Sequence, residues 1–419
     1  MNSRSQSRVG TTFEVVFPEF PTFKQAPQWV RLTQEQGKQD VVEIAYASFD
    51  KHFQKGLKTG VTIKLTWRTA YAKETWVGYV YNSDDTTQST LKRNVIVRGL
   101  GGAFPLKEGG NKVWKNKTAP EIVEDICRQY KLKAVVDKSN VRFGMQSLVG
   151  GITKWEKIQE LADRIGFHAY VSNTTLYFQR IDRLIDQFNS VIPVMSYNDG
   201  SVNAGVVFEA QTLDHFTAKL GDMRETEGAT KAYKTVHGID PVTGKSHSHT
   251  ASPSTVGKNV REKVSAPLFT QVFSHMVADT QAVAKELAEG MAHLARFSLH
   301  GSGKGQGDPR IAPYKTVEIN GTGSETDGFW VVKRAEHYMT YDGRYTIDFK
   351  CMADGAGKNK SGTFRRSTAS TIPVRDVAYE MATGGKQAPS TPTLSSRQPM
   401  VSQTRGGFNV TPNRWVGRA

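Results

Sequence analysis

Cysteine is scarce in this sequence. The 419 residues include two cysteines, Cys127 and Cys351, with no CxxC pair and no dense spacing of cysteine and histidine. We therefore expect neither a disulfide framework nor a structural zinc site. This cysteine usage favours a reducing compartment, the cytoplasm in which the chain is made.

Long apolar runs are also missing. No stretch approaches the roughly 20 apolar residues that a helix needs to cross a bilayer. Residues 1–10 are polar and lack the apolar core of a secretory signal peptide. We expect the chain to remain in the cytoplasm until something releases it, and not to insert into a membrane by itself.

Acidic residues are fewer than basic ones. The 40 Asp and Glu residues stand against 55 Lys and Arg residues, which gives a net charge of +15. Such an excess suits a polyanion or an acidic protein neighbour. The basic residues are spread along the chain, so a solvated basic surface, or one that faces an acidic ring, is favoured over nucleic-acid recognition.

The chain is longer than one ordinary domain, so two or three domains are expected. Its 38 glycines favour a β-rich α+β fold with many turns over a helical bundle. After an N-terminal arm at residues 1–11, short runs rich in β-branched and aromatic residues predict a first antiparallel β domain at residues 12–108. These runs are residues 13–17, 29–32, 41–47, 61–67, 75–81 and 94–98.

Two helix-start signatures come next. Thr118 with Glu121, and Thr153 with Glu156, are capping boxes, in which each side chain accepts from a backbone donor that the helix start leaves free. Each predicts an amphipathic helix, and a hairpin follows the second helix. Together they predict a small α+β module at residues 109–189.

A second β domain is predicted at residues 190–353. It contains a long polar stretch, residues 226–267, which we interpret as a mobile or partner-ordered loop because ordinary connections are much shorter. Beyond it, residues 354–419 are rich in Gly, Ser, Thr and Pro and predict an extended tail that neighbouring subunits order. Strands are predicted near residue 190 and at 206–210, 316–320, 329–337 and 345–352, with a helix at 280–296.

Two patterns resemble ligand sites. His247 and His249 lie two apart, as a metal pair would, but a third ligand at suitable spacing is missing, so a solvated loop is favoured. Alternating glycines lack the strand, loop and helix context of a phosphate-binding loop, so a flexible loop is favoured. These glycines are Gly301, Gly303, Gly305 and Gly307.

Three further candidates carry charge. Asp308 could be catalytic, but a turn before a strand is favoured. Glu160 and Asp163 lie three apart on the second helix, where a solvent-facing pair is favoured over a catalytic one. The basic pair at residues 365–366 suits an acidic neighbour better than a DNA backbone. We therefore predict no catalytic, cofactor-binding or metal-binding residues, and no enzyme activity.

Three sequence segments together resemble the baseplate hub family of phage-type contractile tails. This family includes late control protein D and the hub part of VgrG spikes. The first is the capped helix of residues 116–129, and the second is the helix of residues 153–166 with the hairpin of residues 167–178. The third is residues 307–349, which resemble the closing barrel strands of the family. Where the family often has Pro-Gly before the penultimate strand, this sequence has Pro313-Tyr314, after Ala312.

The resemblance implies a fold and a structural role. The fold is β-rich α+β, with two tail-tube-like antiparallel β-barrel domains and the small α+β module between them. Three such chains would present six barrels to a hexameric tail tube and a threefold face to a central spike. The implied setting is the virion baseplate, with a homotrimer that contacts the tube or distal tail ring, the spike or tip, and baseplate wedge proteins. DNA would only pass through.

Two other functions stay open. One is a tail protein that binds or degrades cell-wall glycan, with the α+β module as the glycan-binding part. The other is a basic protein that binds nucleic acid during DNA ejection.

Overall fold

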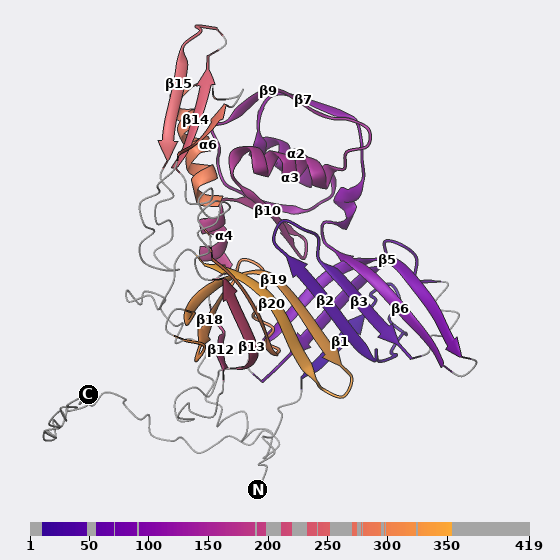
Figure 1. The fold of residues 1–419 in the computed structure, drawn as a ribbon. Coiled ribbons are helices and arrows are strands. Elements are labelled where there is room, and N and C mark those ends of the chain that lie inside the picture. Colours follow the sequence, from indigo (N-terminus) through magenta and orange to yellow (C-terminus); the bar gives the residue numbers. More distant parts are fainter. Residues whose placement is uncertain are drawn as a thin grey trace, which may run out of the picture. The chain divides into compact units, whose positions relative to one another are not determined.

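The computed structural model describes most of the chain up to residue 353 (Figure 1). Residues 1–10 of the predicted arm, the predicted strand at 206–210 and the predicted tail with Arg365 and Arg366 lie outside the described residues. The described residues are 11–47, 56–70, 72–89, 92–188, 191–197, 211–219, 233–240, 242–251, 270–274, 278, 280–294, 297, 299–323 and 326–353.

The first strand-rich segment forms an antiparallel sheet with the strand order β1-β4-β5-β6-β3-β2. Apolar residues alternate with polar ones along these strands, so one face is buried and the other is wet. On β4, for example, Ile63, Leu65 and Trp67 are buried between more exposed neighbours. The strands are β1 (Thr12–Val16), β2 (Trp29–Glu35), β3 (Val41–Tyr46), β4 (Thr62–Arg68), β5 (Lys73–Ser89) and β6 (Lys92–Gly101).

The second strand-rich segment forms a closed barrel, as predicted. Its strands follow the order β19-β18-β12-β13-β17-β20, and β20 pairs with β19 to close it. β12 pairs in parallel with both of its neighbours, and the other pairings are antiparallel. The strands are β12 (Val194–Tyr197), β13 (Gln211–Lys219), β17 (Leu299–Gln306), β18 (Thr316–Asn320), β19 (Gly328–Thr340) and β20 (Tyr345–Ala353).

The prediction of a flexible glycine loop was wrong, because Gly301, Gly303 and Gly305 lie on β17. They occupy its buried face, where neighbouring atoms leave no room for a side chain. A Cβ atom on Gly303 would lie 2.4 Å from Cζ of Phe349, and one on Gly305 would lie 2.3 Å from the carbonyl oxygen of Thr212. The alternation of glycine therefore marks a strand whose core space is filled by rings from neighbouring strands.

The α+β module contains both predicted helices, and both predicted capping boxes are present. α3 ends at Gly166, whose φ of 70° is in the left-handed region that favours glycine. The module elements are η1 (Phe104–Lys107), β7 (Lys112–Thr118), α2 (Ala119–Gln129), β8 (Lys133–Val136), β9 (Arg142–Leu148), α3 (Lys154–Ile165), β10 (His168–Ser172), β11 (Thr175–Gln179) and α4 (Ile181–Phe188).

The predicted polar loop at 226–267 is a strand pair where it is described. β14 (Tyr233–Ile239) pairs with β15 (Ser246–Ala251) and with β16 (Thr270–Ser274), and α6 (Gln281–Leu294) follows. Buried residues of this segment join the hydrophobic core of the α+β module and not that of the barrel. The prediction of residues 190–353 as one β domain therefore differs from the structure here. Core residues of this segment are Val236, Ala251, Val283, Ala284, Leu287 and Ala288.

A close approach of two glycines explains how α6 reaches the module. A Cβ atom on Gly166 would lie 2.6 Å from Cα of Gly290 on α6, so the end of α3 and the middle of α6 touch through their backbones. Apolar residues of α6 then contact the core beneath α3.

The glycine face of β17 can be tested by a substitution at Gly303. We expect Gly303→Ala to lower the free energy of unfolding by about 1–3 kcal/mol, because the added methyl group overlaps the Phe349 ring in a packed core. Ser302→Ala, one residue away on the exposed face, should change it by less than about 0.5 kcal/mol. Denaturant unfolding of the full chain measures both, and a Gly303→Ala variant as stable as the parent would contradict this packing.

Candidate functional site

The joint between the two strand-rich blocks lies on one long strand. The 13-residue strand β19 pairs along one edge with β20, and its other edge is divided between two strands. β18 pairs with residues 328–331 of β19, and β2 pairs with residues 334–340 of β19 in seven residue pairs. The register shifts between Val332 and Arg334, at the point where β18 gives way to β2. A β-bulge of this kind bends a strand, so β19 can leave the barrel and enter the first sheet.

A buried hydrogen-bonded group connects the two blocks beneath this joint. Nε1 of Trp67, on β4, donates to the hydroxyl of Tyr345 at 3.2 Å. The same hydroxyl lies 2.7 Å from Nδ1 of His337, on β19. The Tyr345 hydroxyl therefore accepts from Trp67 and is also hydrogen-bonded to His337, so it links β4 to β19. Burial and the nearby Lys315 lower the pKa of His337 to about 3, so this histidine is neutral at physiological pH.

A second histidine and tyrosine pair connects the module to the barrel. Nδ1 of His168, on β10, lies 3.0 Å from the hydroxyl of Tyr314. Burial lowers the pKa of His168 to about 4. Tyr314 has a φ of 66°, a conformation that costs a residue other than glycine of order 1–3 kcal/mol. This is where the resembling family often has glycine, and here the buried ring and its hydrogen bond hold the tyrosine in place.

Asp40 is a buried carboxyl group close to the same joint. Its Oδ2 accepts from Nε2 of Gln34 at 2.9 Å and from Nε1 of Trp76 at 3.1 Å. Its Oδ1 is buried and has no hydrogen-bond partner among the described residues. Burial raises the pKa of Asp40 to about 7, although the hydrogen bonds from Gln34 and Trp76 oppose this shift.

Asp40 lines a small cavity of about 70 Å³, where side chains of the first sheet, the module and the barrel meet. Glu74 and Lys315 also line this cavity and form an ion pair at 2.9 Å. Asn173 of the module accepts there from the backbone N–H of Val77 at 2.9 Å. The cavity is therefore polar, and Asp40 lines it as a carboxyl group without an ion-pair partner among the described residues.

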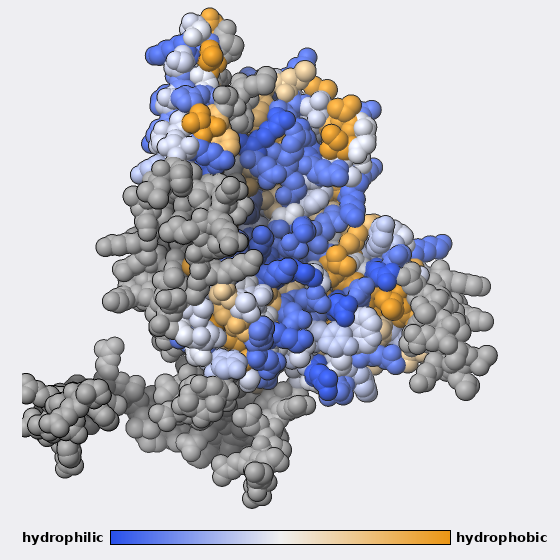
Figure 2. Space-filling view, viewed as in Figure 1, coloured by the Kyte–Doolittle hydropathy of each residue, from blue (hydrophilic) through white to orange (hydrophobic). Residues whose placement is uncertain are grey.

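The exposed face of the joined sheet carries a row of ion pairs that runs across its strands. Arg31 of β2 lies between Glu43 of β3 and Glu336 of β19, at 3.5 Å from each. Glu43 also pairs with Arg98 of β6 at 3.1 Å, and Glu336 with Arg334 at 2.8 Å. Much of the described surface in view is hydrophilic (Figure 2). Exposed pairs of this kind stabilise little, so their effect is to keep this face polar and its charge compensated.

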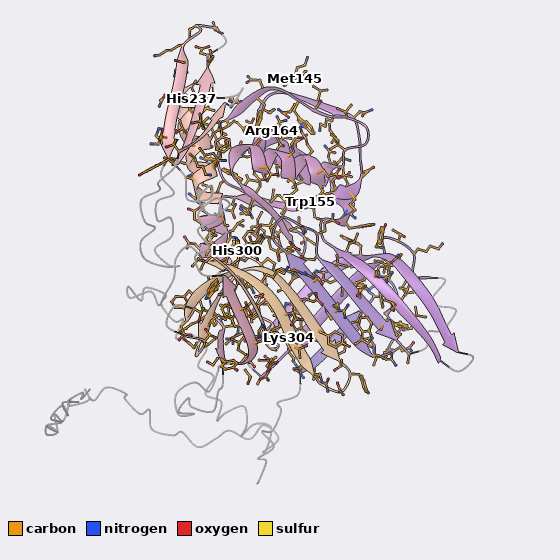
Figure 3. The ribbon with its side chains drawn as sticks, in the orientation of Figure 1. Met145, Trp155, Arg164, His237, His300 and Lys304 are labelled. Carbon is orange, nitrogen blue, oxygen red and sulfur yellow. The ribbon has the colours of Figure 1, made fainter. Side chains whose placement is uncertain are left out.

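The carboxylate candidates on α3 do not form a catalytic pair. Glu160 accepts from Lys157 at 2.9 Å and lies 2.5 Å from Arg164, which Figure 3 shows on the module. Asp163 has a pKa raised by partial burial. Glu160 is therefore occupied by two cations, which is the charge pairing expected of the solvent face of a helix.

His247 and His249 both lie on β15, where they face the same side of the strand. Asp308 is fully buried in a turn, where its carboxylate accepts from the backbone and the guanidinium of Arg310, at 2.7 Å from Nη2. The prediction of a turn at Asp308 is therefore confirmed. In the described part of the chain, no cluster of three or more His, Cys, Asp or Glu side chains is placed to hold a metal ion.

The described helices include none with the length and apolar character of a membrane span. Sequence reasoning did not identify the joint itself. Trp67 and Tyr345 are 278 positions apart, and only the pairing of β2 with β19 brings them together.

The buried histidines and Asp40 predict opposite responses to pH. The unfolded state takes up protons at His168 and His337 below about pH 6.5, and the folded state does not, so stability falls as pH falls from about 6.5 to about 4. Asp40 has the opposite effect, because its pKa is higher in the folded state than in the unfolded state. Its contribution to the free energy of unfolding is lost as pH rises from about 4 to about 7.

We expect Asp40→Asn to remove the loss of stability that the ionisation of Asp40 causes as pH rises. The difference in unfolding free energy between the variant and the parent should rise by up to about 1.4 kcal/mol per pH unit between pH 5 and 7. Denaturant unfolding at a series of pH values measures it. Asparagine can keep both hydrogen bonds, so parallel curves for the two proteins would show that Asp40 is not a protonated carboxyl group in the folded state.

No protein-family model and no curated protein matches the sequence. Solved structures do match it. A tail protein from Neisseria meningitidis MC58 aligns over 82% of this chain and 97% of its own, with a TM-score of 0.57 and 11% identity. The 43 kDa tail protein of prophage MuSo2 from Shewanella oneidensis aligns over 82% and 98%, with a TM-score of 0.51 and 12% identity.

A third structure is the E. coli c3393 protein, a component of the type VI secretion system that is similar to the T4 bacteriophage tail proteins gp27 and gp5. It aligns over 82% of this chain and 76% of its own, with a TM-score of 0.50 and 8% identity. At these identities the likeness is one of fold. The chain has the tail-protein fold that phage tail proteins share with hub-like proteins of type VI secretion, as the sequence resemblance predicted.

Proposed function

We propose that this chain is a structural subunit of a phage-type tail, a baseplate hub that trimerises to adapt a hexameric tail tube to a threefold central spike. The observation that carries this proposal is the pairing of β2 with β19, which fixes two strand-rich blocks side by side in one chain. A trimer of such chains has six blocks, so it meets a sixfold ring on one side and a threefold partner on the other.

The fold supports this proposal, because two of the structures that match over nearly their whole length are tail proteins. The described surface fits it as well. On the exposed face of the joined sheet Arg31 pairs with two glutamates, and the candidate carboxylates Glu160 and Asp308 are occupied by ion pairs and hydrogen bonds. The partners we propose are the tail tube or distal ring, the spike, and wedge proteins, with DNA in passage.

The trimer can be measured directly. We expect the purified full chain, alone or with its tube and spike partners, to have three times the 46.4 kDa mass of one chain. Light scattering after size-exclusion chromatography gives the mass, and negative-stain microscopy should show rings with threefold symmetry. A stable monomer that binds neither tube nor spike protein would overturn the proposed role.

We also propose that the chain has no enzyme activity of its own. Zymography on bacterial cell walls should show no clearing by the full chain, with a lysozyme lane as the positive control. Clearing that persists after further purification, and that is lost in a Glu160→Gln variant, would favour a cell-wall-degrading tail protein instead.

A further inference from the structure

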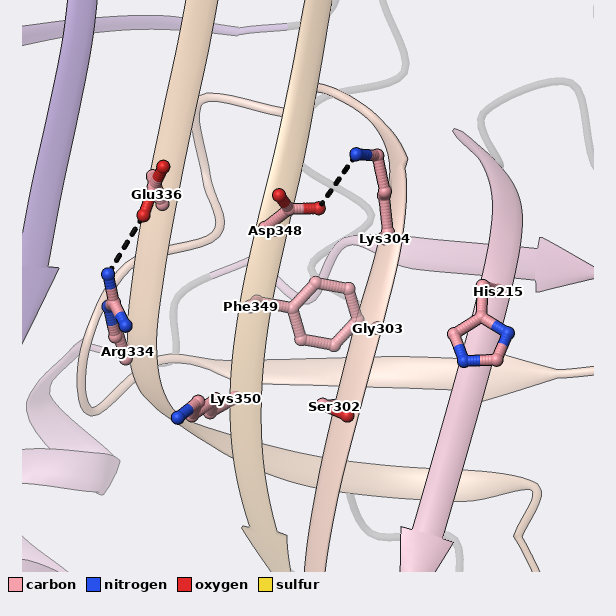
Figure 4. Close-up of a pocket in the computed structure, with 9 residues that line it drawn as sticks. All are labelled: His215, Ser302, Gly303, Lys304, Arg334, Glu336, Asp348, Phe349 and Lys350. Carbon is pink, nitrogen blue, oxygen red and sulfur yellow. Dashed lines mark hydrogen bonds and ion pairs between the residues drawn. The ribbon is translucent and has the colours of Figure 1, made fainter.

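A shallow groove lies on the exposed face of the barrel, across β19, β20, β17 and β13 (Figure 4). It encloses about 300 Å³. Two β-bulges border it, one at the step from Val332 to Arg334 and one at the step from Leu213 to His215. Bulges re-aim side chains and are frequent beside binding sites. Here they bring Arg334 and His215 to the rim of the groove.

One row of side chains across the groove consists of hydrogen-bond donors. Arg334 lies opposite Lys350, Lys350 opposite Ser302, and Ser302 opposite Thr217. The row therefore has a guanidinium, an ammonium and two hydroxyl groups, with no carboxylate among these four residues. Like charges directly opposite each other disfavour a sheet pairing, and Arg334 and Lys350 are such a pair, so an anion near them is favourable.

In the second row of side chains across the groove, the acidic charges are paired with basic ones. Glu336 lies opposite Asp348, and Asp348 opposite Lys304. Glu336 is held by Arg334 at 2.8 Å, and Asp348 by Lys304 at 3.7 Å, as the dashed lines of Figure 4 show. Three cations and two carboxylates line the groove, which leaves a surplus of one positive charge.

The surplus charge is at Lys350. Its side chain is exposed and has no ion-pair partner among the described residues. Beside it, Nε of Arg334 is buried and has no hydrogen-bond partner among them. Glu35 lies opposite Arg334 on β2, but it pairs with Lys38 at 2.9 Å. An anion at this place would pair with Lys350 and lie beside the guanidinium of Arg334.

We propose that this groove binds a single carboxylate of an acidic segment from another protein, between Lys350 and Arg334. A polyanion fits less well, because DNA places a phosphate at every step along its backbone and would meet Glu336 and Asp348 in the next row. A second copy of this chain fits less well too, since its net charge of +15 is repelled by a basic site.

The test uses the full chain and two dye-labelled peptides, acetyl-Gly-Ser-Glu-Ser-Gly-amide and the same peptide with Gln in place of Glu. Fluorescence anisotropy at low ionic strength, where screening is weakest, gives their affinities. We expect the Glu peptide to bind about tenfold more tightly than the Gln peptide. Lys350→Met should remove this preference, and Lys333→Met, a neighbouring exposed lysine outside the groove, should keep it.

Three results would overturn the proposal. The first is equal or undetectable binding of the two peptides, or a preference that Lys350→Met leaves intact. The second is a tighter, Lys350-dependent binding of single-stranded oligothymidylate, which would assign the groove to nucleic acid. The third is self-association of the chain that Lys350→Met abolishes. Since Lys350 is exposed, an unchanged unfolding midpoint in Lys350→Met separates these results from a failure to fold.

Discussion

The backbone pairing of β2 with β19 is the contact on which the rest of the described structure depends. It makes one continuous sheet from two blocks of strands that are far apart in the sequence. Its register is strict, because a slip of one residue would exchange the two faces of β19. Such a slip would place Glu336 in the core and His337 in solvent, and it would separate Trp67 from Tyr345. The bulge at the step from Val332 to Arg334, in the pairing with β20, lies where β18 gives way to β2 along β19.

Polar groups buried around this joint specify the arrangement more than they stabilise it. Two of them have a partner from another block: Trp67 donates to Tyr345, and His168 is hydrogen-bonded to Tyr314. In a medium of low dielectric constant, a buried polar group that loses its partner is costly, so alternative packings of the blocks are disfavoured. The strained backbone of Tyr314 is tolerated for the same reason, since its ring and hydroxyl are held by the module.

The module and the barrel are also interleaved along the chain. β14, β15 and α6 leave the barrel between β13 and β17 and complete the core beneath α2 and α3. Neither part is therefore a simple consecutive domain. The shared core ties the module to the barrel at two places along the chain, which suits the structural role that we propose. The groove around Lys350 lies on a separate, exposed face, where a partner can reach it without disturbing this core.

The sequence by itself determined the local elements. Capping residues set the starts of α2 and α3, alternation marked the strands, and the composition indicated a β-rich fold, because these signals act between residues that are near in sequence. Two segments that the sequence predicted as loops are strands in the structure. The glycines of β17 suggested a loop because the rings that fill their space come from β13 and β20, and the polar stretch of β14 and β15 suggested a loop because its few apolar residues are covered by α6. Only the tertiary structure decided that β2 joins β19, that Asp40 and His337 are buried, and that Lys350 lies beside Arg334. These outcomes depend on pairings between strands that are distant in sequence, and no local pattern encodes which edge meets which.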